Sequence, residues 1–353
     1  MLTFQFTVSI ALIACVLIIF KQLQYVKHSD LGFNRELLLK FNLPFSINNP
    51  ESFKQEIEKL PFVRSSTLSH GCPGYIRSSS ENTFKKNNIY VGDNYLKTMG
   101  IELLEGREFL KSDLNKVCFI NEEAKRKYEF SDIKAKKVKY GEDTYEVAGV
   151  VKNFNTESLH SAITPLLLIY STDIKLDNLS VRLTAGNTSQ YLTQMKQVWQ
   201  KFCPNEPFEF TFYDQLFQAM YAKEENLSIS ITFFSIIAIA LTCMGILGQI
   251  IMICYKRTKE IGIRKVNGAR VTEILALLNK DFLKWVAIAF VIATPIAYYA
   301  MNKWLQNFAY RTELSWWVFT LAGAAAMLIA LATVSWQSWR AASRNPVESL
   351  RSE

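Results

Sequence analysis

The chain consists of four apolar stretches and one long polar region. Charged residues are absent from residues 1–20, 227–254, 285–302 and 314–339, whereas residues 21–226 are rich in polar side chains. A helix rises about 1.5 Å per residue, so roughly 20 apolar residues cross a hydrocarbon core of about 30 Å. The pattern therefore predicts an α-helical membrane protein with four transmembrane helices and a large domain inserted between spans 1 and 2.

The first apolar stretch has a second interpretation as a cleaved signal peptide, because Leu12-Ile-Ala-Cys15 resembles a lipoprotein processing site. A signal peptide begins with a basic region, and none precedes this stretch. Apolar residues also continue beyond Cys15 as far as Phe20. A retained transmembrane helix over residues 1–20 is the favoured interpretation.

The polar region, residues 21–226, combines strand and helix signals. Short runs rich in apolar and β-branched residues predict strands at 37–43, 88–91, 117–120, 145–151, 166–170, 179–183 and 208–212. Helices are predicted at 51–60, 94–99, 122–128 and 188–202. Interleaved strands and helices are typical of an α+β domain, here one of two subdomains.

Capping residues mark where several of these helices start. Asn49 precedes Pro50, which places a capping amide directly before a proline at the first helical position. Asn121 is predicted to open another helix in the same way. Asp93 and Gly100 are predicted to start and to stop the short helix that lies between them.

The segments outside the spans follow from the same pattern. Residues 255–284 hold a basic segment and then an amphipathic stretch, 271–284, which predicts a helix lying along the membrane surface. Residues 303–313 are predicted to form a short extracytoplasmic loop. Residues 340–353 are a basic tail, which predicts a cytoplasmic location.

Local features also distinguish the third and fourth spans. Pro295 predicts a kink within the third. Trp316 and Trp317 open the fourth and are typical of anchors at the membrane surface. The stretch Gly323-Ala-Ala-Ala-Met327 is rich in small residues, so we expect another helix to approach the fourth span closely there.

The formal net charge of +8 is unevenly distributed along the chain. Residues 21–225 carry 27 basic and 26 acidic residues, a net charge of +1, whereas the remainder carries 13 basic and 6 acidic residues, a net charge of +7. Positive charge beside apolar stretches marks the cytoplasmic side, so the large domain is predicted outside and both termini inside. A protein that binds nucleic acid would carry its excess charge on the soluble part, so nucleic acid is excluded as a partner.

The basic segment after the second span has an internal order beyond its charge. It reads YKRTKEIGIRKVNGAR from Tyr255 to Arg270 and holds six basic residues. Glu260 precedes Arg264 by four residues, a spacing that brings a carboxylate and a guanidinium together on one helix face. A mere orientation anchor needs only the charge. The mixture of apolar, glycine and paired charged residues therefore indicates a docking element for a cytoplasmic partner.

Residues 257–269, RTKEIGIRKVNGA, closely resemble the R-x-K-E-I-G-I-R-K-x-x-G-A signature of the MacB/FtsX-type ABC transporter permeases. In that family this segment is a coupling helix that rests in a groove of a separate ATPase subunit. We call residues 257–269 the coupling segment. The resemblance implies an ATPase-coupling role for ten of its residues: Arg257, Lys259, Glu260, Ile261, Gly262, Ile263, Arg264, Lys265, Gly268 and Ala269.

The resemblance extends over essentially the whole chain. VGDNYLKTMGIELLEGREF (91–109), FINEEA (119–124) and VAGVVKNF (147–154) are similar to the family's extracytoplasmic core domain, although Asn153 stands where relatives often have aspartate. The tail AASRNPVESLR is similar to the family's terminal A-A-x-x-N-P-V-E-x-L-R. The resemblance implies a multi-pass protein of the bacterial inner membrane with its large domain outside.

Many permeases of this family consist of two similar four-span halves, and FQFTVSIALI near the start of this chain resembles the opening of a second half. The chain is therefore expected to be such a half or to pair with an identical copy. The ATPases of ABC systems work in pairs, which also favours a second permease copy or half as a partner.

Catalytic chemistry is not predicted. The sequence contains no G-x-x-x-x-G-K-[ST] loop to cradle nucleotide phosphates, so ATP hydrolysis is expected from a separate subunit and this chain is expected not to be an enzyme. Glu157, Ser158 and His160 lie too close in sequence to converge as a catalytic triad without special geometry. Neither a cofactor nor a metal site is expected, because the cysteines and histidines lack paired spacing.

Two further features bear on the class of protein. Cys72, Cys118 and Cys203 lie in the polar region, where one disulfide and one unpaired thiol could form if the region is extracytoplasmic. The four apolar stretches carry no charged residue, which argues against an ion channel or a secondary transporter.

The expected function is that of an ABC transporter permease that converts ATPase closure in the cytoplasm into movement of its extracytoplasmic domain, for efflux or release of a substrate. A second hypothesis is an FtsX-like signalling adaptor, in which the same stroke activates a cell-wall hydrolase. A third is an ATPase-independent receptor or sensor. A periplasmic adaptor is a further partner under the first hypothesis, and a hydrolase under the second.

Overall fold

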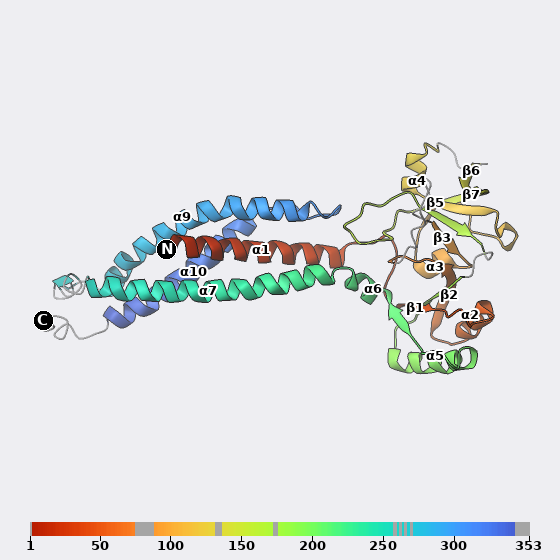
Figure 1. Cartoon of the computed structure of the whole chain (residues 1–353), viewed down its shortest axis with the longest axis horizontal. Coiled ribbons are helices and arrows are strands. Elements are labelled where there is room, and N and C mark those ends of the chain that lie inside the picture. The colour runs from red at the N-terminus through yellow and green to blue at the C-terminus, as the bar shows by residue number, and fades with distance from the viewer. Residues whose placement is uncertain are drawn as a thin grey trace. The chain divides into compact units, whose positions relative to one another are not determined.

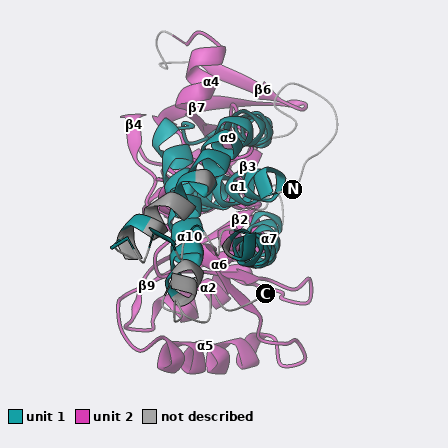
Figure 2. Ribbon diagram, turned by 90° about the vertical axis from the view of Figure 1, so that its left-hand side faces the viewer, with its two compact units in different colours: residues 1–27, 223–353 teal, residues 28–222 magenta. Residues whose placement is uncertain are grey.

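The computed structural model describes residues 2–74, 88–130, 136–171, 176–256, 260, 263–264, 267–268 and 271–342. The chain forms two compact units, drawn in different colours in Figure 2. Unit 1 comprises Met1–Lys27 and Lys223–Glu353, and unit 2 comprises His28–Ala222. The polar domain is thus inserted into the helical one.

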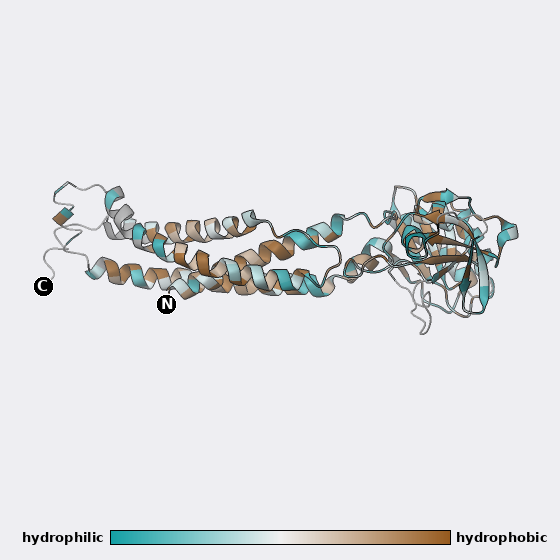
Figure 3. Ribbon diagram, turned by 90° about the horizontal axis from the view of Figure 1, so that it is seen from above, coloured by the Kyte–Doolittle hydropathy of each residue, from teal (hydrophilic) through white to brown (hydrophobic). Residues whose placement is uncertain are grey.

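Four long helices make up the described part of unit 1 (Figure 1). They are α1 (Leu2–His28), α7 (Ala222–Lys256), α9 (Val271–Leu305) and α10 (Trp316–Ala342). Each contains a stretch long and apolar enough to cross a membrane, and Figure 3 shows hydrophobic residues along the middle of these helices. The prediction of four membrane-spanning helices is confirmed.

The helices extend further than the apolar stretches that predicted them. α1 continues through Lys21 to His28, and α7 begins at Ala222, five residues before the uncharged stretch. The stretch 271–284, predicted to be a separate surface helix, is continuous with the third span in α9, which also includes Pro295. Charged residues end a hydrophobic run but do not end a helix, and no proline or glycine interrupts these extensions.

Small residues allow the helices of unit 1 to pack closely. A Cβ atom placed on Gly323 of α10 would lie 2.5 Å from Phe290 Cδ2 of α9, so these helices approach closely at the position that the small-residue stretch predicted. Helices α1 and α7 are also in close contact, because the hydroxyls of Ser9 in α1 and Thr242 in α7 are 3.0 Å apart and buried. Helix packing in lipid relies on such small and polar contacts.

Unit 2 is organised around a ten-stranded mixed sheet with the order β10-β1-β9-β2-β3-β8-β5-β7-β4, in which β6 also pairs with β7. The pairs β3–β8 and β5–β7 are parallel, and the other pairs are antiparallel. The strands are β1 (Leu38–Asn42), β2 (Val63–His70), β3 (Asn88–Val91), β4 (Leu103–Gly106), β5 (Val117–Asn121), β6 (Lys137–Tyr140), β7 (Asp143–Val151), β8 (Leu167–Tyr170), β9 (Asn178–Leu183) and β10 (Phe210–Phe212).

Two hydrophobic clusters cover the two halves of this one sheet. In the first, α2 (Pro50–Glu58) and α5 (Thr188–Phe202) pack on β1, β2 and β9 through aromatic residues such as Phe53 and Trp199. In the second, α4 (Glu122–Lys127) packs on β5 and β7. Figure 1 shows α2 and α5 together near β1, and α4 near β5 and β7. The α+β class is confirmed, and its two halves share one sheet.

Two of the predicted helix caps are confirmed, and one is wrong. Asn49 accepts a hydrogen bond from the Ser52 N–H (3.0 Å), and Asn121 accepts one from the Ala124 N–H (2.9 Å). The short helix α3 (Tyr95–Met99) does not start at Asp93, because Asn94 occupies the capping position. Asp93 instead accepts a hydrogen bond from the Tyr170 hydroxyl. Gly100 ends α3 with a φ of +69°, as predicted.

Candidate functional site

The coupling segment lies only partly within the described residues. Four of its ten candidate residues are described, namely Glu260, Ile263, Arg264 and Gly268. The other six lie outside the described residues: Arg257, Lys259, Ile261, Gly262, Lys265 and Ala269.

Three described residues of the coupling segment are helical, namely Glu260, Ile263 and Arg264, and two of them form an ion pair. Glu260 Oε1 and Arg264 Nη2 are 2.9 Å apart, as the four-residue spacing predicted, and their side chains are 44% and 46% exposed. Ile263 is 57% exposed. Gly268 has a φ of +87°, a left-handed conformation typical of a helix end. Among the described residues of the segment, Ile263 and the Glu260–Arg264 pair are thus exposed.

The coupling segment follows the end of α7 directly. α7 has 35 residues and ends at Lys256, one residue before Arg257. At about 1.5 Å per residue the helix is about 52 Å long, which exceeds the roughly 30 Å of a hydrocarbon core. A single helix therefore joins the coupling segment to the last residue of unit 2.

The carboxyl end of α1 is bonded to the loop between α9 and α10. Gln22 is fully buried, and its side-chain amide donates to the Tyr310 carbonyl (3.0 Å) and accepts from the Thr312 N–H (2.8 Å). The neighbouring Lys21 ammonium donates to the Glu313 carbonyl (3.1 Å). We call these contacts the α1 clamp, and they hold α1 to the α9–α10 hairpin.

Ion pairs also join the segments that lead into and out of the inserted domain. Within unit 1, Lys27 of α1 lies 2.7 Å from Glu225 of α7. Within unit 2, Arg35 Nε lies 3.0 Å from Asp214 Oδ1 in α6 (Tyr213–Ala219). Burial raises the pKa of Asp214 although Arg35 opposes the change, so this carboxylate is protonated at a higher pH than an exposed aspartate.

Neither Gln22 nor Arg35 stood out in the sequence. Both are polar residues within a polar stretch, which is ordinary for a solvated surface. Their partners lie 290 and 179 residues further along the chain, and no local pattern connects them. Only the position of Gln22, two residues after the apolar span ends at Phe20, gives a weak signal of an interfacial contact.

Two family models match the chain. The model of the MacB-like periplasmic core domain matches residues 7–198, and that of the FtsX-like permease C-terminal region matches residues 232–346. The first match alone spans more than half of the chain. The chain belongs to the MacB/FtsX-type ABC transporter permeases. The permease is accordingly a multi-pass protein of the bacterial inner membrane with a periplasmic core domain.

Curated relatives of the permease share the printed name macrolide export ATP-binding/permease protein MacB. The one from Escherichia coli is 23% identical over 277 residues, which cover 74% of this chain and 43% of the relative. The one from Aggregatibacter actinomycetemcomitans is 22% identical over 246 residues, covering 63% and 38%. The permease thus spans about two fifths of the length of these relatives, and the family models place the similarity in permease domains.

Solved structures are similar as well. The crystal structure of the periplasmic region of MacB from Actinobacillus actinomycetemcomitans is 18% identical, with a TM-score of 0.41, and the match covers 55% of this chain and 97% of that chain. A domain of a putative permease protein from Porphyromonas gingivalis is also 18% identical, with a TM-score of 0.32.

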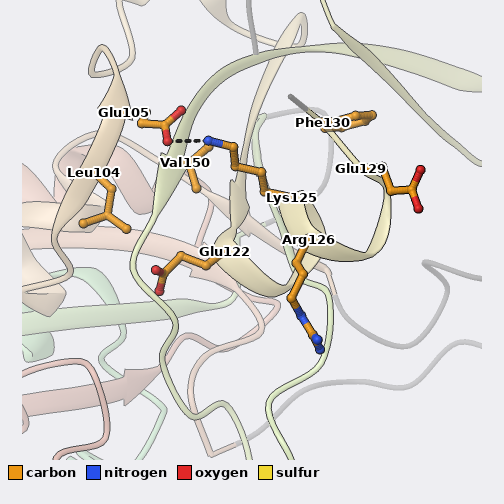
Figure 4. Close-up of a pocket in the computed structure, with 8 residues that line it drawn as sticks. All are labelled: Leu104, Glu105, Glu122, Lys125, Arg126, Glu129, Phe130 and Val150. Atoms are coloured by element: carbon orange, nitrogen blue, oxygen red, sulfur yellow. Dashed lines mark hydrogen bonds and ion pairs between the residues drawn. The ribbon is translucent and has the colours of Figure 1, made fainter. Parts of the chain in front are cut away.

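The core domain of the permease has a shallow hollow of about 460 Å³ beside α4 (Figure 4). A salt bridge between Lys125 and Glu105 crosses it, while Arg126 and Glu129 point away from that bond. The Glu122 carboxylate also has a partner within the domain, because it accepts a hydrogen bond from the Asn153 N–H (2.9 Å). These charges are largely paired within the domain, so the hollow has no evident role in coupling.

Ser158 and His160 of the permease do form a hydrogen bond, with 3.1 Å between Ser158 Oγ and His160 Nδ1. The imidazole also stacks on Tyr221, with 5.9 Å between ring centres, and the Tyr221 hydroxyl accepts a hydrogen bond from the Leu159 N–H (2.6 Å). These contacts fix the turn 158–161 against the segment before α7. The geometry favours a packing role for His160.

The cysteines of the core domain are free thiols. Cys72, Cys118 and Cys203 are all buried and unbridged, so the disulfide that the sequence allowed is not formed. Burial raises the pKa of the Cys118 thiol to about 12, which makes it an unreactive hydrophobic side chain. Among the residues that the structure describes, no cluster of three or more His, Cys, Asp or Glu side chains could hold a metal ion.

Proposed function

We propose that the permease couples ATP hydrolysis by a separate cytoplasmic ATPase subunit to motion of its periplasmic core domain, for efflux or release of a substrate. The proposal rests on the continuity of helix α7 between the core domain and the coupling segment. α7 runs without a break from Ala222, the last residue of unit 2, to Lys256, and the coupling segment begins at the next residue.

A continuous helix is suited to transmit displacement. Its backbone N–H groups bond to carbonyls of the same helix, so a sharp kink in it requires a proline or another local defect. α7 contains no proline, and its mid-section is held to α1 by the bond between Ser9 and Thr242. A shift of the coupling segment is therefore expected to reach the end of the core domain with little loss.

The exposed turn of the coupling segment is the expected contact for the ATPase. The Glu260–Arg264 pair and the adjacent Ile263 supply charge complementarity and an apolar anchor. The remaining residues of the segment complete this surface under the same proposal. A second permease copy or half is proposed as a further partner, because the ATPases of ABC systems work in pairs.

The names of the curated relatives indicate which substrate class to test first. Those proteins are called macrolide exporters, and macrolides are therefore the first candidates for the permease. The uncharged spans offer no polar pathway across the membrane, which favours expulsion of a substrate that is already on the periplasmic side. A periplasmic adaptor would receive such a substrate, whereas a signalling role would require a cell-wall hydrolase in its place.

Substitution of Glu260 tests the coupling role. The Glu260–Arg264 pair is nearly half exposed, so Glu260→Ala should cost only about 0–1 kcal/mol of stability. At a docked interface the same change leaves a partner charge buried and unpaired, which weakens association by about 2–5 kcal/mol. We expect normal membrane insertion and a large loss of ATPase co-purification and of permease-stimulated ATP hydrolysis. Gly262→Trp should act in the same way, and Lys259→Arg should have much less effect.

Glu56→Ala provides a matched control. Glu56 forms an exposed ion pair with Lys59 on helix α2 of the core domain, with side chains that are 42% and 70% exposed. This variant should retain the ATPase. If Glu260→Ala instead removes the protein from the membrane while the surviving fraction binds the ATPase normally, the segment is an anchor and the proposal is wrong.

A further inference from the structure

Arg182 occupies an unusual position for a cation. It lies on β9, near the centre of one half of the sheet, and is only 7% exposed. Its guanidinium donates three hydrogen bonds to backbone carbonyls: Nε to Thr98 (2.8 Å), Nη1 to Glu36 (2.8 Å) and Nη2 to Asn34 (2.5 Å). The side chain thus joins a central strand to two other parts of the core domain.

The three carbonyls belong to two segments that have few other means of pairing. Thr98 lies in the last turn of α3, where carbonyls lack an intrahelical partner. Asn34 and Glu36 lie between the end of α1 and the start of β1, a stretch without regular secondary structure. Arg182 therefore satisfies three backbone carbonyls, of which that of Thr98 is in a buried bond and those of Asn34 and Glu36 are in partly buried ones.

The same irregular stretch, residues 29–37, is also held by neighbouring contacts. The Asn34 N–H donates to the Met99 carbonyl (2.9 Å), and a Cβ atom placed on Gly100 would lie 3.0 Å from Asn34 Cβ. At Gly32 a Cβ atom would lie 2.2 Å from the Asn153 carbonyl oxygen, so only glycine fits there. The stretch is consequently seated on the domain rather than looped away from it.

The attachment of this stretch to the domain affects how movement is transmitted, because the stretch joins a membrane helix to the sheet. α1 ends at His28, and β1 begins at Leu38, so residues 29–37 are the covalent link between a membrane helix and the sheet. A slack link of nine residues would absorb a displacement of α1. A link that is bonded to an inner strand of the sheet would pass the displacement to the core domain.

We propose that Arg182 is a positioning residue of the transport stroke, which fixes residues 34–36 to the sheet so that movement of α1 is transmitted to the core domain. This inference rests on the proposed coupling function. It assigns to the chain segment that follows α1 an attachment to the sheet, in addition to the continuous helix α7 that follows the core domain in the chain.

Amide hydrogen exchange on the intact permease in lipid nanodiscs tests the attachment without any ATPase. Arg182→Met removes all three donors, and amides of residues 32–38 should then exchange roughly ten-fold faster or more. Peptides from β5 and β8 should keep their protection. Arg64→Met, which changes an exposed arginine on the neighbouring strand β2, is the matched control and should match the wild type.

Arg182→Lys is a conservative variant that distinguishes loss of these hydrogen bonds from misfolding of the whole domain. Lysine keeps the charge and can reach one carbonyl, so exchange should rise less and only in residues 32–38. If Arg182→Met leaves exchange in residues 32–38 unchanged, the attachment does not depend on Arg182 and the inference fails. If both variants raise exchange equally across β5 and β8, Arg182 supports the whole core and is not a positioning residue.

The role of Arg182 in transport is tested separately, by measuring ATP hydrolysis and export. With the ATPase that co-purifies with the permease, Arg182→Met should retain stimulated ATP hydrolysis while export of a macrolide such as erythromycin falls roughly ten-fold or more. Export that falls only in proportion to the amount of folded protein would overturn the positioning role. If the wild-type permease recruits no ATPase, the proposed function fails, and the exchange measurement still decides the attachment.

Discussion

Gln22 is a polar side chain that is shielded from water yet fully hydrogen-bonded. Its amide bonds one carbonyl and one N–H of the α9–α10 loop, so its removal takes a hydrogen bond from each of these partly buried groups. Glu260 is the opposite case, because its ion pair is nearly half exposed. Loss of Gln22 should therefore appear as lost stability, whereas loss of Glu260 should appear as lost association.

We expect Gln22→Leu to destabilise the membrane unit. Each lost hydrogen bond costs roughly 0.5–1.5 kcal/mol, so unfolding in mixed micelles should occur at a lower denaturant fraction. The amide of Thr312 should also lose protection from hydrogen exchange, because the Gln22 side chain is the acceptor of its hydrogen bond.

Gln22→Glu separates the two bonds of this side chain. A carboxylate still accepts from the Thr312 N–H but cannot donate to the Tyr310 carbonyl. Thr312 should remain protected in this variant while the overall stability falls. Equal exchange of Thr312 in wild type and Gln22→Leu would show that the α1 clamp is not formed.

At the scale of secondary structure, the sequence predicted every element in which an apolar or capping pattern was strong. β1, β5, β8 and β9 are fully or largely buried apolar strands, and asparagine caps open α2 and α4. β2 was missed because its sequence VRSSTLSH is mostly polar, although Ser66, Thr67 and Ser69 are completely buried. Tertiary contacts alone make that segment a central strand.

The contacts of the candidate site were likewise predictable from the sequence only in part. The Glu260–Arg264 pair was predictable because both residues belong to one helical turn with a fixed spacing. The α1 clamp and the bonds of Arg182 were not predictable, because they join residues far apart in sequence. Their partners are backbone groups, which leave no mark on the sequence at all.

Packing between α9 and α10 gives a test at the element scale. A Cβ atom on Gly323 would lie 2.5 Å from Phe290 Cδ2, so Gly323→Ala should overpack the contact and destabilise unit 1 by about 1–3 kcal/mol. Gly248→Ala is the matched control in α7, where a Cβ atom meets no atom within 4 Å. That change should be neutral or slightly stabilising, because alanine favours helices by up to about 1 kcal/mol. Equal unfolding midpoints for the two variants would contradict the close approach of α9 and α10.

For the molecule as a whole, two connections through the chain link the membrane unit to the periplasmic core domain. α7 leaves the core domain as an unbroken helix and leads to the coupling segment. α1 reaches the core domain through residues 29–37, which are bonded to Arg182. The proposed coupling therefore requires that these two stretches of chain transmit movement, and it requires no catalytic chemistry in this chain.

If the permease transmits a stroke, the nucleotide state of its ATPase should move the core domain. Lys59→Cys places a spin label at an exposed position of the core domain, at the end of α2. Pulsed electron paramagnetic resonance would measure the distance between the labels of two permease copies, bound to the ATPase in nanodiscs. We predict that the distance distribution differs between the nucleotide-free and ATP-trapped states, and that Glu260→Ala abolishes the difference. An unchanged distribution in the wild type, with ATPase bound and hydrolysing ATP, would contradict the account.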